Sequence, residues 1–124
     1  MLYRISFEFR LTRRVAWAGD GEGFYRHVEA VATKLEACEL VEDVRVVSHA
    51  ADSLLTFDFL IDGAHYAAAT AQAVATVRDA IESCGGRHFG LDSVGKGLLT
   101  SAGAGPGLET PIWQHRRMHV DIAA

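Results

Sequence analysis

Apolar and polar side chains alternate along the first stretch of the chain, residues 2–12. Successive side chains on a β-strand point to opposite faces of a sheet, so this alternation predicts a half-buried strand. One face carries the apolar side chains Tyr3, Ile5, Phe7, Phe9 and Leu11. The other face carries Arg4, Ser6, Glu8, Arg10 and Thr12. We expect the rest of the chain to cover the aromatic and aliphatic face.

Two later stretches repeat apolar residues at the three- and four-residue steps of an amphipathic α-helix. The first runs from about residue 22 to residue 38 and follows a glycine-rich turn at residues 19–23. The second covers about residues 64–84 and is rich in alanine, which has a high helix propensity. The glycine pair at residues 85–86 is typical of a helix C-terminus. Both stretches are therefore expected to bury one side against a sheet.

Three further stretches have the alternation of strands: residues 44–48, 53–61 and 87–94. The resulting order is strand, helix, strand, strand, helix, strand. This order predicts an α+β fold, a ferredoxin-like split βαβ sandwich (βαββαβ) with two helices on one face of an antiparallel sheet. A fold of this kind hosts many unrelated functions, so it assigns no activity.

The C-terminal part of the chain lies outside that plan. Residues 95–111 form a glycine-rich loop that is long for a compact domain, and residues 112–122 alternate again as an additional C-terminal strand. We expect this strand to lie at an edge and to extend the sheet toward a second subunit. The whole chain, residues 1–124, is expected to form a single domain.

The composition narrows the classes of partner. Apolar residues make up 49% of the chain, as in ordinary folded proteins. The formal net charge of −4 argues against a nucleic-acid partner, because such proteins neutralise phosphates with excess basic charge. No apolar run reaches the roughly 18 residues of a membrane span, and no signal segment precedes the first strand. We therefore expect a cytoplasmic protein with neither nucleic-acid nor membrane partners.

The most suggestive polar row lies on the predicted C-terminal strand. Strict alternation places His115, Arg117, His119 and Asp121 on one face, together with Trp113. Imidazole, guanidinium and carboxylate groups in a row can bind an anionic small molecule or carry out acid–base chemistry. The same row is also typical of a solvated or subunit-facing outer surface, and the sequence leaves both interpretations open.

Metal and cofactor sites are not expected. His115 and His119 would be about 13 Å apart on a strand, too far to share a zinc ion whose ligands lie near 2 Å. The glycine-rich segments match neither the Walker nor the dinucleotide-binding spacing. Cys38 and Cys84 lie on the apolar stripes of the helices and have no histidine beside them, so we expect structural thiols.

Two functional hypotheses follow, and no catalytic residue is assigned in either. The first is a homo-oligomeric interaction module that uses the open face of the sheet, where apolar side chains such as Leu54 and Leu60 lie among charged ones. The alternative is a cofactor-independent enzyme or carrier that holds a small-molecule ligand in a cavity between two sheets. Its candidate ligand-binding residues are Glu8, Arg10, Trp113, His115, Arg117 and His119. That architecture resembles the dimeric α+β barrels, among them cofactor-free oxygenases and cyclases of aromatic or polyketide-like compounds.

Overall fold

The computed structural model describes residues 1–15, 17, 21–91 and 109–123. In chain order the elements are β1 (Leu2–Thr12), α1 (Glu22–Ala37), β2 (Val41–His49), the 3₁₀ turn η1 (Ala50–Asp52), β3 (Leu54–Asp62), α2 (Tyr66–Ser83), β4 (Arg87–Phe89) and β5 (Ile112–Ile122). The predicted α+β class is confirmed. Most of the predicted glycine-rich loop, residues 95–108, lies outside the described part of the chain. None of the described helices is long and apolar enough to cross a membrane.

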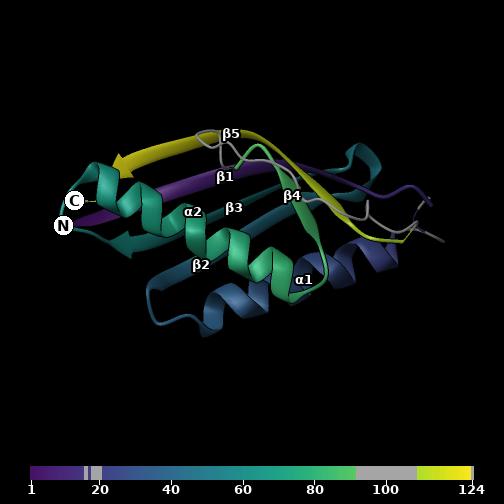
Figure 1. Cartoon of the computed structure of the whole chain (residues 1–124), viewed down its shortest axis with the longest axis horizontal. Coiled ribbons are helices and arrows are strands. Elements are labelled where there is room, and N and C mark those ends of the chain that lie inside the picture. The colour runs from purple at the N-terminus through teal and green to yellow at the C-terminus, as the bar shows by residue number, and fades with distance from the viewer. Residues whose placement is uncertain (16, 18–20, 92–108, 124) are drawn as a thin grey trace, which may run out of the picture.

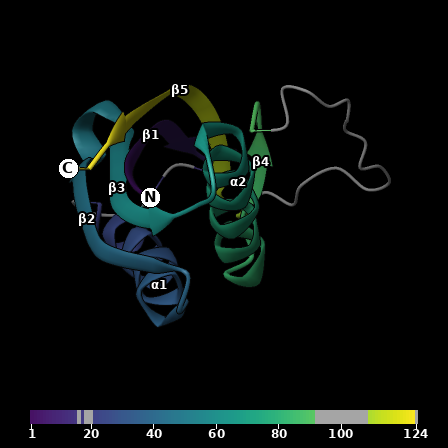
Figure 2. The same cartoon turned by 90° about the vertical axis from the view of Figure 1, so that its left-hand side faces the viewer.

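The five strands form one mixed sheet in the order β2-β3-β1-β5-β4. The neighbours are antiparallel except for β4 and β5, which are parallel. Both helices lie on the same side of this sheet, as Figures 1 and 2 show. The sheet order differs from the ferredoxin-like order, because β5 lies between β1 and β4.

The length of the strands explains this order. β5 pairs with β1 from Tyr3 to Thr12, so the backbone groups that the two long strands turn toward each other are paired along most of their length, apart from the irregularity between Glu8 and Phe9. β4 is shorter than predicted and ends at Phe89, because the next residue, Gly90, adopts a left-handed conformation with φ +91°. β4 therefore pairs with β5 only as far as Gln114, and no other described strand pairs with the rest of β5 on that side. The expectation of an edge strand is wrong for residues 112–114, which lie between β1 and β4.

The hydrophobic core lies between the sheet and the two helices. The aromatic and aliphatic face of β1 is buried as predicted, with Phe7 and Phe9 fully enclosed. The buried stripe of α1 consists of Phe24, Val28, Val31 and Leu35. α2 contributes smaller side chains, including Ala69 and Ala73, which let the helix approach the sheet closely. Truncating a buried phenylalanine in such a core typically costs about 3–5 kcal/mol.

A β-bulge interrupts the pairing of β1 with β5. Glu8 is paired with Arg117, whereas the next residue, Phe9, is paired with His115, so Arg116 is the extra residue. A bulge of this kind places two residues opposite one and reverses the alternation beyond it. The residues of β5 before and after the bulge therefore follow different patterns of inward and outward side chains.

Candidate interaction surface on the open sheet face

The face of the sheet opposite the helices is not covered by any element that the structure describes. The pairing registers place residues of all four long strands on this open face. They are Glu42, Arg45, Val47 and His49 of β2, Leu54, Thr56, Asp58, Leu60 and Asp62 of β3, Leu2, Arg4, Ser6, Glu8, Arg10 and Thr12 of β1, and Ile112, Gln114, Arg117, His119 and Asp121 of β5. The surface is therefore mostly polar, with five aliphatic side chains.

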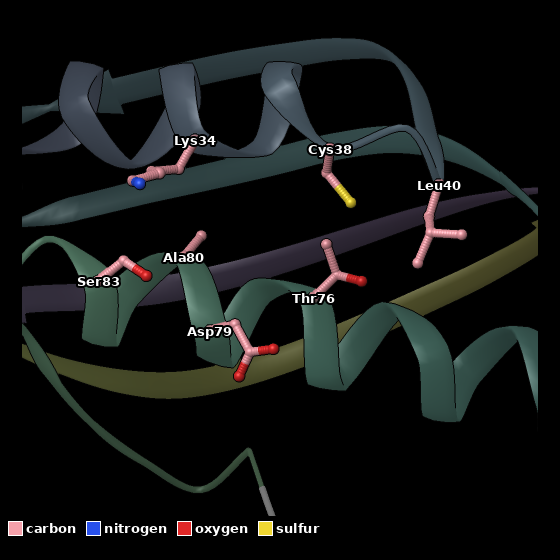
Figure 3. Close-up of a pocket in the computed structure, with 7 residues that line it drawn as sticks. All are labelled: Lys34, Cys38, Leu40, Thr76, Asp79, Ala80 and Ser83. Carbon is pink, nitrogen blue, oxygen red and sulfur yellow. The ribbon is translucent and has the colours of Figure 1, made fainter.

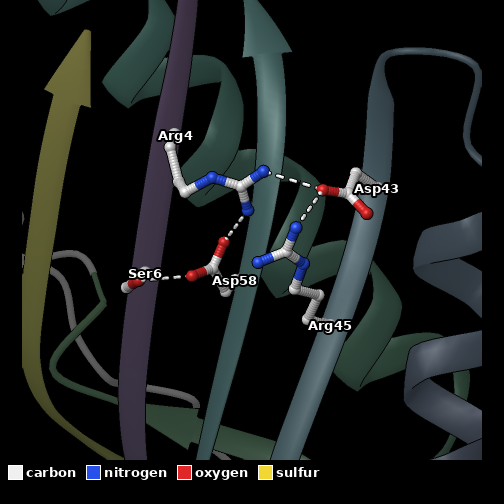
Figure 4. Close-up of polar contacts among 5 residues, drawn as sticks. All are labelled: Arg4, Ser6, Asp43, Arg45 and Asp58. Carbon is white, nitrogen blue, oxygen red and sulfur yellow. Dashed lines mark hydrogen bonds and ion pairs between the residues drawn. The ribbon is translucent and has the colours of Figure 1, made fainter. Parts of the chain in front are cut away.

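Arg4 is the centre of one polar network on this face (Figure 4). Its Nη2 donates to Oδ2 of Asp43 at 2.7 Å, and its Nη1 donates to Oδ1 of Asp58. Arg45 donates to the same Asp43 oxygen at 3.0 Å, and the Ser6 hydroxyl donates to Asp58 at 3.3 Å. The hydrogen bond from Arg4 lowers the pKa of Asp43, and its two carboxylate partners raise the pKa of Arg4.

A second network forms at the bulge. The carboxylate of Glu8 forms one ion pair with Nε of Arg116 at 3.1 Å and another with Nε of Arg117 at 3.2 Å. The extra residue makes this possible, because it places two consecutive arginines opposite one glutamate. Only 23% of the Glu8 side chain is exposed, whereas Arg117 is 73% exposed and can turn toward another partner.

The remaining charges on the β5 side lie closer to water. His119 Nε2 and Asp121 Oδ2 are 2.9 Å apart, and the two side chains are 72% and 66% exposed. Arg10 is exposed and makes no ion pair within the described residues. Exposed pairs of this kind contribute little to stability, so these groups are available for contacts outside the chain.

The bulge divides the six predicted ligand-binding residues between two faces. Glu8, Arg10, Arg117 and His119 lie on the open face. The other two candidates lie on the helix side: Trp113 is fully buried, and His115 packs against Phe7 and Phe9 with ring centroids 5.8 and 5.4 Å apart. The expectation that His115 shares a face with Arg117 and His119 is wrong, because strict alternation does not continue through a bulge. The six residues do not line one pocket.

The sequence interpretation missed a half-buried histidine at the margin of the core. Trp113 Nε1 donates a hydrogen bond to Nε2 of His27 at 2.9 Å. Burial lowers the pKa of His27 to about 4, so the ring is neutral and carries its proton on Nδ1. Burial also lowers the pKa of His115, whose Nε2 has no hydrogen-bond partner in the structure. The signal for His27 was its position three residues after Phe24, at the margin of the buried stripe of α1.

The helix side has a groove between the C-terminal end of α1 and the C-terminal half of α2 (Figure 3). Its volume is about 210 Å³, below the roughly 300–1,000 Å³ of ligand pockets. Lys34 and Cys38 line it from α1, facing Thr76 and Asp79 of α2. Both cysteines are free and half-buried rather than fully buried.

No set of three or more histidine, cysteine or carboxylate side chains in the described parts of the chain has the geometry to hold a metal ion. Comparisons with protein-family models, with curated proteins and with solved structures found no match to this chain. The functional argument therefore depends on the open face itself.

Proposed function

We propose that this chain is a small oligomeric interaction module without catalysis, and that its open sheet face packs against the same face of a second copy. The fold is best understood as a ferredoxin-like sandwich with β5 inserted between β1 and β4, acting in the cytoplasm. The observation that carries the proposal is the distribution of charge on the open face, which is self-complementary.

The two halves of this face have opposite net charge. The half formed by β2 and β3 carries four carboxylates and one arginine: Glu42, Asp43, Asp58, Asp62 and Arg45. The half formed by β1 and β5 carries four arginines and two carboxylates: Arg4, Arg10, Arg116, Arg117, Glu8 and Asp121. Opposite charges meet if a second copy is turned about a two-fold axis parallel to the strands.

The residue types also fit a contact surface. Apart from the histidines His49 and His119, the basic residues on this face are arginines, and β1, β2, β3 and β5 contain no lysine. Protein interfaces are enriched in arginine and depleted in lysine, because a planar guanidinium loses less freedom when it is fixed. Val47, which is 60% exposed, and the half-buried Leu54 and Leu60 supply apolar area between the charges. Two such sheets would pack with their strands nearly aligned.

The test is the mass of the full chain in solution, measured by sedimentation velocity over a range of protein concentrations. Val47→Asp adds a charge to the open face and is expected to weaken the dimer by tenfold or more, since it buries an unpaired carboxylate. Leu40→Asp is the matched control, because Leu40 is 50% exposed but lies beside the groove on the helix side. Equal effects of the two substitutions, or a wild-type protein that stays monomeric, would contradict the proposal.

A further inference from the structure

The outer edge of β5 presents backbone groups that have no partner in the described chain. β4 pairs only with the first three residues of β5, Ile112, Trp113 and Gln114. Beyond them, no described strand lies beside residues 115–122 (Figure 1). A row of unpaired N–H and C=O groups on an edge strand is a template for another strand.

The pairing with β1 determines which of these groups point outward. Ala123 N donates to the carbonyl of Leu2 at 2.8 Å. Hydrogen-bonded and non-hydrogen-bonded residues alternate along an antiparallel pair, so the backbone groups of Arg117, His119 and Asp121 also point toward β1. Those of Met118, Val120 and Ile122 point away from β1, and no described strand pairs with them.

The charges along this edge are arranged symmetrically about His119. A second copy of β5, running antiparallel and centred on His119, places Arg117 opposite Asp121 twice. The same register places Met118 opposite Val120, and their outward backbone groups form the hydrogen-bonded pairs. Centring the pairing on Met118 would instead place Arg117 opposite His119, and centring it on Val120 would shorten the paired stretch by two residues in each copy. One register therefore combines the longest pairing with opposite charges.

The other edge of the sheet is less suited to pairing. The register of β2 shifts between Glu42 and Arg45, and Asp43 at this irregularity has a left-handed φ of +53°. A bulge in the middle of an edge strand turns its backbone groups out of line. The stretch of β5 from Arg117 to Ile122 has no such interruption.

We propose that two copies of this chain join through their β5 edges, antiparallel about His119, into one continuous sheet. The two open faces then lie on the same side of the joined sheet. This contact is made by the backbone edge of β5. Arg117 and Asp121 also contribute to the charge of the open face, but the edge contact does not depend on the face-to-face contact proposed above.

Charge reversal tests the register. Arg117→Asp places carboxylate opposite carboxylate, and Asp121→Arg places guanidinium opposite guanidinium, so each variant alone is expected to raise the dissociation constant of the edge contact roughly tenfold or more. Mixing the two variants restores both opposite-charge pairs and is expected to give a heterodimer, detected by native mass spectrometry. The double variant Arg117→Asp/Asp121→Arg should self-associate as the wild type does. If mixing and the double swap both fail to restore association in folded protein, the proposal is wrong.

A cross-link locates the contact independently of charge. His119 lies opposite its own copy in a non-hydrogen-bonded pair, where Cα atoms are about 4.5 Å apart and a disulfide can form. His119→Cys, in a Cys38→Ser/Cys84→Ser background, is expected to give an oxidised dimer. The control Gln114→Cys, also at an exposed position of the same strand, should not. Cross-linking of both variants or of neither overturns the proposal. Adding Val47→Asp to the His119→Cys variant separates the two contacts. This substitution weakens the face-to-face contact, and the cross-link between the β5 edges should still form.

Discussion

Acid is predicted to destabilise this protein through His27. In the folded chain the Nε2 atom of His27 accepts a hydrogen bond from the buried indole of Trp113. Protonation would place an N–H group against that N–H donor and a charge inside the core, so the folded state resists it. The unfolded chain exposes the ring and binds the proton at its ordinary pKa.

The size of the effect follows from the two pKa values. The pKa of His27 falls from its ordinary value of 6.5 to about 4 in the folded chain, and each unit of difference corresponds to about 1.4 kcal/mol. Because the pKa of His27 is lower in the folded chain than in the unfolded chain, the unfolded chain takes up the proton first as the pH falls. The contribution of neutral His27 to the free energy of unfolding is therefore complete above about pH 6.5 and is lost as the pH falls toward about 4. The expected loss of unfolding free energy over this range is about 2–3 kcal/mol.

Urea denaturation followed by circular dichroism, at one protein concentration and at several pH values from 7.5 to 4.5, measures this loss. His27→Gln is the informative variant, because its amide oxygen can accept the hydrogen bond from Trp113 but takes up no proton. Burial lowers the pKa of His115 as well. The difference in unfolding free energy between the wild type and His27→Gln at each pH therefore isolates the contribution of His27. His49→Gln, at an exposed position on β2, is the control. A difference that does not change with pH would refute the account of His27.

Two further substitutions test the packing around the same indole. Trp113→Phe removes the donor to His27 and leaves space in a fully buried position, so we expect the free energy of unfolding in urea to fall by about 2–4 kcal/mol. Phe89→Leu, at the exposed end of β4, should cause little change. Gly86→Ala would bring a new Cβ within 2.9 Å of both Trp113 Nε1 and Ile81 Cγ2, and we expect about 1–3 kcal/mol of destabilisation. Gly85→Ala also costs stability, through its φ of +86°, but meets nothing within 4 Å. Only the substitution at Gly86 should therefore alter the fluorescence of Trp113; an unchanged spectrum would contradict the packing around the indole.

The sequence predicted the elements whose pattern is local and strong. β1, β3 and both helices lie within two residues of their expected bounds, because each has an uninterrupted period of two or of three to four residues. The position of β5 was not predictable in this way, since the choice of a neighbour in the sheet depends on matching the length of β1. Asp43 and Arg116 mark irregularities of two strands that no periodic pattern shows.

The bulge at Arg116 connects the core with the candidate surface. With strict alternation, Trp113 and His115 would lie on the open face, and Phe9 and Leu11 would lose their inward neighbours on β5. The extra residue returns Trp113 to the core, where it stacks on Phe57 and meets His27. The same residue gives Glu8 two arginines and makes the β1–β5 half of the open face positive. The buried aromatic cluster and the charge asymmetry of the proposed contact therefore depend on one feature of one strand.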